Sequence, residues 1–232
     1  GKKENISDTA KVASRFVNLI AARVYKRQDI WDFAKYADVP VINMLDDFAH
    51  PCQILGDFQT IKEKKNSLEN MKLSYFGDAH NNVTYDLMRM CAMYGWRMDV
   101  ACPKDPVYSP EQIIFGEVSD FSKETGAEIK IVHNAIEAAR DADVIYTDSW
   151  MSYGIPQEQE EIRKKAFMPF QVTSTIIQSA KPKVVFMNCL PAMREYEQTT
   201  EVIDGAQSIV FDQAENRLHI QKAIMLFLRE KF

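Results

Sequence analysis

The sequence has few of the groups that would indicate a metal centre, a disulfide framework or a membrane protein. Only four of the 232 residues are cysteines: Cys52, Cys91, Cys102 and Cys189. They form no C-x-x-C pair and no metal-ligand spacing with the four histidines, so no metal site is expected. Isolated cysteines favour a reducing compartment. No apolar run approaches the roughly 20 residues that cross a bilayer, so no membrane association is expected.

The sequence also lacks the patterns of several ligand-binding classes. The formal net charge is −5, and Lys and Arg are scattered rather than gathered in a basic patch, so nucleic acid is not an expected partner. No G-x-G-x-x-G follows a predicted strand and no G-x-x-x-x-G-K-[ST] loop occurs, which disfavours dinucleotide and P-loop enzymes. A local cluster of Arg and backbone N–H groups can still bind a small anion.

What remains is an ordinary globular composition, with 46% hydrophobic and 26% charged residues, long enough for one large or two modest domains. Short β-rich runs alternate with helical patterns, which predicts an α/β fold with doubly wound parallel sheets. The polar run 62–70 is the best candidate for a domain boundary. The predicted strands are 22–25, 39–43, 73–77, 97–102, 128–132, 144–147, 184–188 and 209–213. The predicted helices are 6–22, 28–37, 51–64, 82–94, 110–125, 135–141, 157–180 with interruptions, and 214–232.

Polar and reactive side chains follow five of these eight predicted strands. The clusters are 46–53, 78–82, 148–154, 188–191 and 213–217. Because open parallel sheets bind ligands beyond the carboxyl ends of their strands, these clusters predict one site. The site has many hydrogen-bonding groups but no cofactor cradle, which suits the positioning and electrostatic stabilisation of two small polar substrates.

Motifs in these clusters resemble those of the aspartate/ornithine carbamoyltransferase family. His50-Pro51-Cys52-Gln53 resembles the family's H-P-x-Q signature, whose His and Gln hold the carbamoyl group of carbamoyl phosphate. Arg23 and Arg217 match family arginines near the same ligand. The resemblance therefore implies a carbamoyl-phosphate site made of Arg23, His50, Gln53 and Arg217.

A second group of motifs resembles the ornithine branch of the family. Asp148 with Ser152-Tyr153-Gly154 is similar to the D-x-x-x-S-M-G segment, and 188–191 is similar to the H-C-L-P segment. H-P-x-Q alone is shared with the aspartate enzymes, whereas these segments favour ornithine. The resemblance implies that the ornithine-binding residues are Asn82, Asp148, Ser152, Tyr153, Cys189 and Leu190.

The resemblance runs from about residue 5 to the C-terminus and implies transfer of a carbamoyl group from carbamoyl phosphate to the δ-amine of L-ornithine, giving citrulline and phosphate. It implies two domains of the carbamoyltransferase type: an incomplete carbamoyl-phosphate domain, residues 1–64, and an ornithine domain, residues 65–212. The helix 213–232 is expected to pack back on the first domain. A cytoplasmic homotrimer without metal or cofactor is also implied, with the mitochondrial matrix as another possible location.

The residue types suit this reaction. The δ-ammonium of ornithine must lose a proton before it attacks, and we expect Asp148 and Cys189 to bind and help deprotonate it; a free thiol, with a pKa of about 8.5, is within range of that role. His50, Gln53 and Arg23 are expected to polarise the carbamoyl carbonyl. The catalytic residues are therefore predicted to be Asp148, Cys189, His50 and Arg23, whereas Asn82, Asp148 and Ser152 fix the amino-acid end of the acceptor.

Departures from the family pattern leave other functions open. Asn188 stands where the family commonly has His, and Tyr153 where it has Met, which leaves room for another acceptor amine such as putrescine. The family's phosphate-binding S-x-R-T-R motif, whose place is before Gly1, has no counterpart in the sequence. We therefore expect these residues to be part of a longer chain and to be inactive alone. A catalytically inactive homologue that acts as a binding or scaffold protein is the other alternative.

Each candidate side chain also has an ordinary structural interpretation. His50 can be a helix-start residue, Cys189 a small buried hydrophobe, Asp148 a turn or helix cap, and Arg217 a solvated helix residue. A hydrolase that pairs Cys189 with His50 or His219 is a further alternative, although the sequence assigns no partner to orient the histidine.

Overall fold

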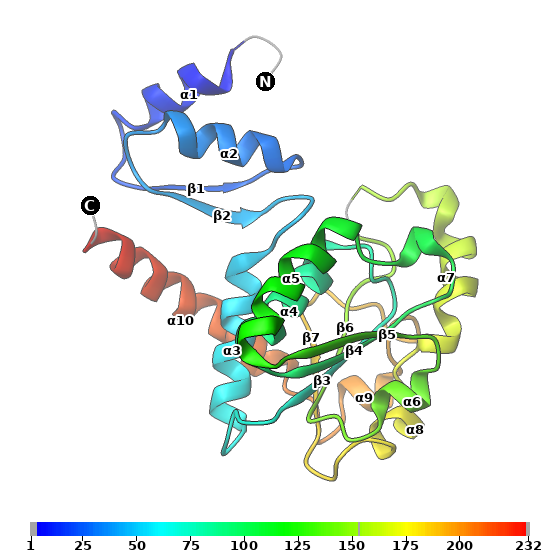
Figure 1. Cartoon of the computed structure of the whole chain (residues 1–232). Helices are drawn as coiled ribbons and strands as arrows, with labels where there is room; N and C mark the ends of the chain where they lie inside the picture. Colours follow the sequence, from blue (N-terminus) through cyan, green and yellow to red (C-terminus); the bar gives the residue numbers. More distant parts are fainter. Residues whose placement is uncertain (1–3, 153, 231–232) are drawn as a thin grey trace.

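The computed structural model describes residues 4–152 and 154–230 and contains two parallel sheets (Figure 1). The small sheet pairs β1 (Ile20–Arg23) with β2 (Val41–Leu45). The large sheet has the strand order β5-β4-β3-β6-β7. Its strands are β3 (Lys72–Phe76), β4 (Arg97–Ala101), β5 (Glu128–Val132), β6 (Val144–Thr147) and β7 (Val185–Asn188). The predicted α/β class with parallel sheets is confirmed.

Helices cover both faces of the large sheet, and α1 and α2 lie on one side of the small sheet (Figure 1). The longer ones are α1 (Ile6–Ala13), α2 (Arg27–Tyr36), α3 (Pro51–Lys64), α4 (Asn82–Met93), α5 (Gln112–Thr125), α7 (Glu160–Phe167) and α10 (Val210–Arg229). The shorter ones are α6 (Ala135–Ala139), α8 (Ser174–Gln178) and α9 (Thr200–Ile203), with the 3-10 turns η1 (Pro106–Tyr108), η2 (Gln157–Gln159) and η3 (Met168–Phe170). Among the described residues, no helix is both long and apolar enough to span a membrane.

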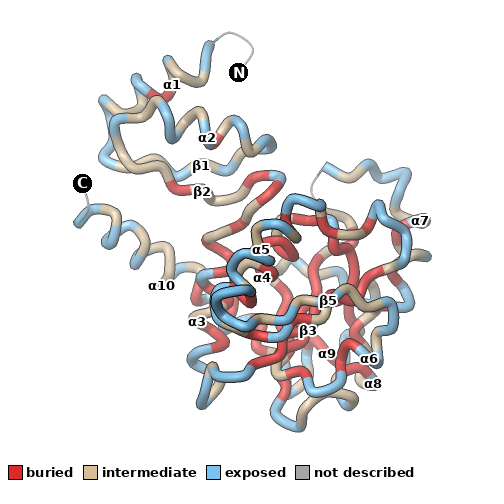
Figure 2. Tube along the Cα trace, viewed as in Figure 1, coloured by how far each residue is buried: buried red, intermediate tan, exposed pale blue. Residues whose placement is uncertain are grey.

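The core lies on both faces of the large sheet. Side chains of α3, α4 and α5 cover one face, and side chains of α6, α8 and α9 cover the other. Every residue of β3 is buried, as expected for a central strand of a sheet covered on both sides. Figure 2 shows buried residues concentrated here, whereas α1, α2 and the end of α10 are largely exposed or half-buried. The packed sheet is therefore the rigid platform for the residues at its carboxyl edge.

Local sequence signals explain where several elements begin and end. Pro51 occupies the first turn of α3, where its missing N–H is harmless. The Asn81 side chain accepts a hydrogen bond from the backbone N–H of Thr84 at 2.8 Å and so caps α4. Gly126, with a φ of 78°, ends α5 in the left-handed conformation.

Two predicted elements are wrong. The predicted helix 6–22 ends at Ala13, and Ile20 begins a strand instead. The backbone N–H of Ile20 donates to the Pro40 carbonyl. The predicted strand 209–213 is the start of α10: its β-branched residues favoured a strand, but tertiary packing buries Val210, Gln213 and Asn216 on one side of a helix. Ser208, just before this segment, forms an isolated parallel bridge to Phe186.

Helix α10 packs along α3, the helix that connects the small sheet to the large one (Figure 1). The Asn216 side chain donates to Thr60 Oγ1 at 3.0 Å and to Glu63 Oε2 at 2.8 Å. These contacts join segments more than 150 residues apart in the sequence. The division into domains at residues 64 and 65 stays a prediction.

Candidate active site

His50 immediately precedes α3 and is held by its backbone. Its N–H donates to Asp86 Oδ2 at 2.6 Å, and the residue is only 7% exposed. Burial, together with the positive charges of Arg217 and Arg23, lowers the pKa of His50 to about 3. The imidazole is therefore neutral at physiological pH, and its buried Nδ1 has no hydrogen-bond partner among the described residues. A neutral ring can donate or accept a hydrogen bond to a ligand without carrying charge.

Gln53 and Arg217 meet where α3 crosses α10. Gln53 Oε1 accepts a hydrogen bond from Arg217 Nη1, and Gln53 Nε2 donates to Asp57 Oδ1 at 2.8 Å. Arg217 Nε is buried and unpartnered within the described part of the chain. Because a buried guanidinium N–H without a partner is unfavourable, this atom suits a hydrogen bond to an anionic or carbonyl ligand.

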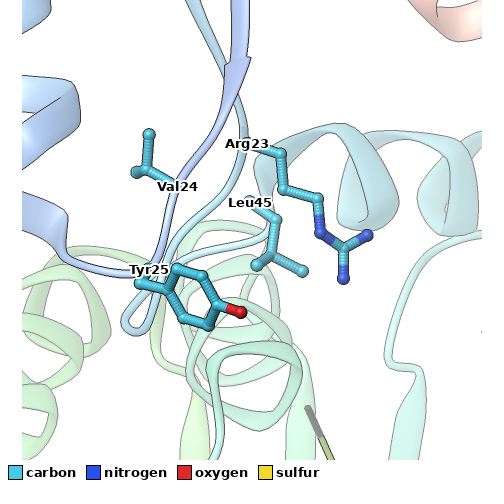
Figure 3. A pocket seen from close by; sticks show the side chains of 4 residues that line it. All are labelled: Arg23, Val24, Tyr25 and Leu45. Atoms are coloured by element: carbon cyan, nitrogen blue, oxygen red, sulfur yellow. The ribbon is translucent and has the colours of Figure 1, made fainter. Parts of the chain in front are cut away.

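Arg23 lies at the end of β1 and lines a pocket of about 310 Å³ with Val24, Tyr25 and Leu45 (Figure 3). Arg23 is exposed, unlike the other three members of the predicted carbamoyl-phosphate site. Its charge nevertheless contributes to the lowered pKa of His50, so the two side chains belong to the same region. The structure thus brings His50, Gln53 and Arg217 together from the start of α3 and from α10, with Arg23 within electrostatic reach of His50.

Asp148 and Cys189 follow the two neighbouring strands β6 and β7. Thr147 pairs with Asn188 in the sheet register, so the next residues on both strands also lie side by side. Cys189 Sγ donates to Asp148 Oδ1 at 3.1 Å. Burial, reinforced by the nearby Asp148 carboxylate, raises the pKa of Cys189 well above its ordinary value. The raised pKa favours the protonated thiol, which here acts as a hydrogen-bond donor to the Asp148 carboxylate.

The Asp148 carboxylate is the better proton acceptor of this pair. Burial raises its pKa, while hydrogen bonds from Cys189 and from the backbone of Ser149 oppose that shift. The Ser149 N–H donates to Asp148 Oδ1 at 2.7 Å, the same oxygen that Cys189 contacts. No described residue donates a hydrogen bond to Oδ2, which leaves that oxygen for a ligand.

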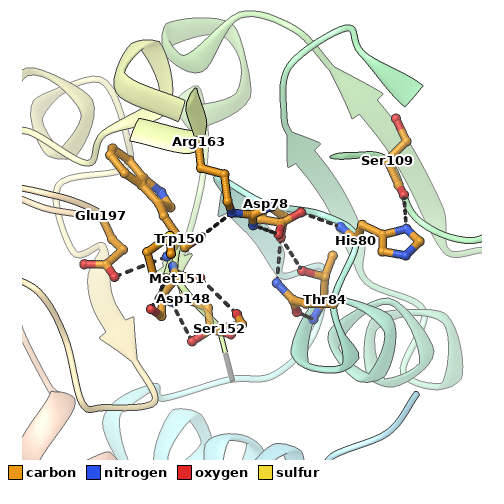
Figure 4. Close-up of polar contacts among 12 residues, drawn as sticks. Asp78, His80, Thr84, Ser109, Asp148, Trp150, Met151, Ser152, Arg163 and Glu197 are labelled. Carbon is orange, nitrogen blue, oxygen red and sulfur yellow. Dashed lines mark hydrogen bonds and ion pairs between the residues drawn. The ribbon is translucent and has the colours of Figure 1, made fainter. Parts of the chain in front are cut away.

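The remaining predicted acceptor residues lie in different surroundings. Ser152 is half-buried, and its hydroxyl donates to the Ser149 carbonyl at 3.1 Å, close to Asp148 (Figure 4). Asn82 begins α4 and donates to the Asp46 carbonyl at 2.6 Å, so its amide is oriented toward the segment between β2 and α3. Leu190 is half-buried beside Cys189, with a φ of 52°. Tyr153 lies outside the described residues.

A Cys–His hydrolase is not supported by this arrangement. Among the described residues, the Cys189 thiol bonds to a carboxylate and to no histidine. His219 interacts with Glu215 on the exposed side of α10, at 3.3 Å. His50 has a strongly lowered pKa and cannot hold a proton as an imidazolium at neutral pH.

Known proteins match nearly the whole chain. The carbamoyl-P binding domain of aspartate/ornithine carbamoyltransferase matches residues 1–63, and the Asp/Orn binding domain of the same family matches residues 69–228. The chain belongs to the aspartate/ornithine carbamoyltransferase family.

Individual family members are similar throughout. Ornithine carbamoyltransferase of Thermococcus kodakarensis is 50% identical over 222 residues, which cover 96% of this chain and 69% of the relative. The enzyme of that name from Methanocaldococcus jannaschii is 47% identical over 232 residues, 100% of this chain and 75% of the relative. The solved ornithine transcarbamoylase of Giardia lamblia superposes with a TM-score of 0.90 at 41% identity, covering 96% of this chain and 74% of that structure. The solved ornithine carbamoyltransferase of Pyrococcus furiosus superposes with a TM-score of 0.90 at 48% identity, covering 96% of this chain and 70% of that structure.

Two buried charged residues that the sequence did not single out support the loop after β6 (Figure 4). Arg163 of α7 forms a buried ion pair with Asp78 and donates from Nε to the Trp150 carbonyl at 2.6 Å. Glu197 accepts from the Trp150 N–H at 3.3 Å and from the Met193 N–H at 3.0 Å. No local motif marks either residue, because the partners are distant in the sequence. Arg163 contacts Trp150 and Asp78, which are 13 and 85 residues away. Glu197 contacts Trp150, which is 47 residues away.

We predict that Glu197 makes the protein less stable as the pH rises. Burial raises its pKa from the ordinary 4.5 to about 7, so between these values the folded state holds a proton that the unfolded state has released. Stability then falls with increasing pH across that window, by at most about 3 kcal/mol. Urea unfolding from pH 5 to pH 8 should show that Glu197→Gln gains stability relative to wild type as the pH increases.

The exposed Glu195 provides the control for this measurement. A hydrogen bond from the Thr200 backbone lowers the pKa of Glu195, whereas burial raises that of Glu197. Glu195→Gln should therefore not gain stability relative to wild type as the pH increases. Parallel stability curves for wild type and Glu197→Gln would contradict the assignment.

Proposed function

We propose that this protein transfers the carbamoyl group of carbamoyl phosphate to the δ-amine of L-ornithine, giving citrulline and phosphate. The observation that carries the proposal is that the buried Asp57 carboxylate accepts hydrogen bonds from Gln53, the partner of Arg217, and from Tyr146, two residues before Asp148. The His50–Gln53–Arg217 cluster and the Asp148–Cys189 pair therefore lie close to each other. One cluster offers donors to a carbonyl or an anion, and the other offers an acceptor to an ammonium group. The names of the relatives support the same reaction.

In the proposed reaction the amine nitrogen attacks the carbamoyl carbon. A C–N bond forms, the bond between carbon and the phosphate oxygen breaks, and the phosphate leaves with that electron pair. The δ-ammonium first gives a proton to Asp148, whose raised pKa makes it a better acceptor than an ordinary carboxylate. The second proton leaves with the phosphate. Cys189 keeps its proton and holds Asp148 through Oδ1.

The carbamoyl-binding side chains would stabilise the charge that develops on the carbonyl oxygen. Neutral His50 and the remaining N–H of Gln53 are hydrogen-bond donors, while Arg23 and Arg217 supply positive charge. Ser152 and Asn82 are proposed to fix the amino-acid end of ornithine. Carbamoyl phosphate is proposed to bind to residues 1–64 and ornithine to 65–212.

The Asn188 departure from the family pattern does not favour another acceptor. Its Nδ2 donates to Gln198 Oε1 at 2.9 Å, and its Oδ1 accepts from the Leu190 N–H at 2.9 Å. The residue is only 1% exposed. Both ends of the amide are therefore used inside the protein, so this departure gives no reason to prefer putrescine over ornithine.

The proposal is tested by supplying each acceptor alone to the full-length protein. Ornithine is expected to give citrulline and phosphate in equal amounts, and aspartate is expected to give only background phosphate release. Phosphate release without citrulline would contradict carbamoyl transfer to ornithine.

We further propose, on the family resemblance, that the protein is a cytoplasmic homotrimer, with the mitochondrial matrix as the alternative location. Light scattering of the purified full-length protein distinguishes a trimer from a monomer. Fluorescent tagging in the source cell distinguishes the two locations.

A further inference from the structure

Asp57 is a fully buried carboxylate to which three side chains from three elements donate. Gln53 Nε2 of α3 and Gln213 Nε2 of α10 donate to its Oδ1 at 2.8 and 2.7 Å. The Tyr146 hydroxyl of β6 donates to its Oδ2 at 2.8 Å. Asp57 is 0% exposed. We call Asp57, Gln53, Gln213 and Tyr146 the Asp57 network.

The carboxylate fixes the orientation of the Gln53 amide. An ionised carboxylate only accepts hydrogen bonds, so the NH₂ end of Gln53 must face Asp57 and the carbonyl end must face Arg217. One N–H and one lone pair of Gln53 then remain. These match the carbonyl and the NH₂ group of a carbamoyl ligand.

The other branch of the network reaches the acceptor side. Gln213 Nε2 uses its hydrogens on Asp57 and on the Tyr146 hydroxyl, at 3.0 Å for the latter. Gln213 Oε1 accepts from the backbone N–H of Asn188 at 3.0 Å, directly before Cys189. Tyr146 lies two residues before Asp148 on β6. The network therefore holds the chain one residue before Cys189, at Asn188, and two residues before Asp148, at Tyr146.

Stability alone explains this arrangement poorly. Burying a carboxylate is unfavourable, and apolar residues of similar volume often replace buried charges without loss of stability. Burial raises the pKa of Asp57 to about 6, against the opposing effect of the hydrogen bonds from Tyr146, Gln53 and Gln213. The group is therefore ionised at neutral pH, as the donor geometry requires.

We propose that Asp57 is a positioning residue that holds the carbamoyl-binding Gln53 and the Asp148–Cys189 pair in a fixed relative geometry. It acts through Gln53 on one side and through Gln213 and Tyr146 on the other. The inference rests on the proposed function, because it assigns Asp57 a role in placing the two substrates of that reaction.

The kinetic test compares Asp57→Asn with Thr60→Val in the full-length protein. The amide that replaces the Asp57 carboxylate has one acceptor oxygen for three donors, so the hydrogen bonds of Gln53, Gln213 and Tyr146 must rearrange. We therefore expect kcat/KM for both substrates to fall about 10²-fold. Thr60 is equally buried on α3 and bonds to Asn216 of α10 at 3.0 Å, outside the network. Thr60→Val is expected to change kcat/KM by less than about twofold. Unchanged kinetics in folded Asp57→Asn would overturn the proposal.

Tyr146→Phe provides a second variant that removes a single oxygen. Gln213 keeps its hydrogen bond to Asp57, so we expect a smaller loss, about 10-fold, mainly as a higher KM for ornithine. This variant carries the kinetic test if Asp57→Asn does not fold. An unchanged KM for ornithine in Tyr146→Phe would count against the network's link to the acceptor side.

Hydrogen exchange measured by mass spectrometry gives a readout that does not depend on activity. Asp57→Asn is expected to speed exchange of the Asn188 amide by about 10-fold or more, because its acceptor Gln213 loses a fixed partner. Thr60→Val should leave that amide unchanged. If the wild type makes no citrulline but Asp57→Asn still speeds exchange of the Asn188 amide, the proposed function is refuted and the link from Asp57 to Asn188 is supported. Unchanged exchange would refute that link.

Discussion

Asp148→Asn is expected to lower kcat for citrulline formation by about 10³-fold without unfolding the protein. Both described hydrogen bonds to this carboxylate, from Cys189 and from the Ser149 backbone, go to Oδ1. An asparagine keeps that oxygen and replaces only Oδ2 by an NH₂ group. The substitution therefore removes the proton acceptor and the negative charge while preserving the local hydrogen bonds. Steady-state rates and circular dichroism measure the two effects separately.

Asp143→Asn is the matched control, because Asp143 immediately precedes the same strand at its opposite end. It pairs with Lys181 at 2.7 Å and lies far from the carboxyl edge of the sheet. We expect a loss of stability without loss of kcat. A similar kcat for Asp148→Asn and wild type would exclude Asp148 as the proton acceptor.

Cys189→Ser keeps a hydrogen-bond donor, so its kcat for citrulline formation should fall only about 10-fold.

Arg217→Met is expected to raise the KM for carbamoyl phosphate about 10²-fold, since a charge-assisted hydrogen bond contributes about 1.5–3 kcal/mol. Methionine retains an unbranched stem of the side chain against α3 but removes the guanidinium. Gln53 then loses its donor partner, and His50 loses one of the two positive charges that lower its pKa. The KM for ornithine should change much less, because Arg217 is only a minor influence on Cys189.

Arg229→Met on the same helix provides the control for charge and helix propensity. Arg229 is exposed near the end of α10, away from the candidate site. Initial rates at varied carbamoyl phosphate compare both variants with wild type. Equal increases in KM for the two variants, or no increase for Arg217→Met, would show that Arg217 does not bind this substrate.

Local patterns predicted the large sheet well, because its strands are short apolar runs separated by helical segments. The strands 128–132 and 144–147 were predicted with the bounds observed. The rule that parallel strands end at one edge also placed Asp148 next to Cys189, as the register of β6 and β7 confirms. The strand predicted at 209–213 was wrong because the packing of α10 outweighs the strand preference of Ile209 and Val210.

Buried polar partners were the part of the site that local sequence could not reveal. Asp57 looks like an ordinary helical carboxylate in the sequence, and only the fold brings Tyr146 and Gln213 to it from 89 and 156 residues away. The raised pKa of Cys189 likewise depends on burial and on Asp148, so the ordinary thiol value was misleading. Asn82 was chosen from a motif, and its bond to Asp46 shows that motif position alone does not tell where an amide points.

The most direct test of the proposed reaction is a competition between acceptors. The full-length protein is incubated with carbamoyl phosphate and equal concentrations of ornithine, putrescine and aspartate, and mass spectrometry identifies the carbamoylated products. Citrulline should be the main product. Carbamoylputrescine as the main product would contradict the acceptor assignment, and no product from folded protein would favour an inactive homologue.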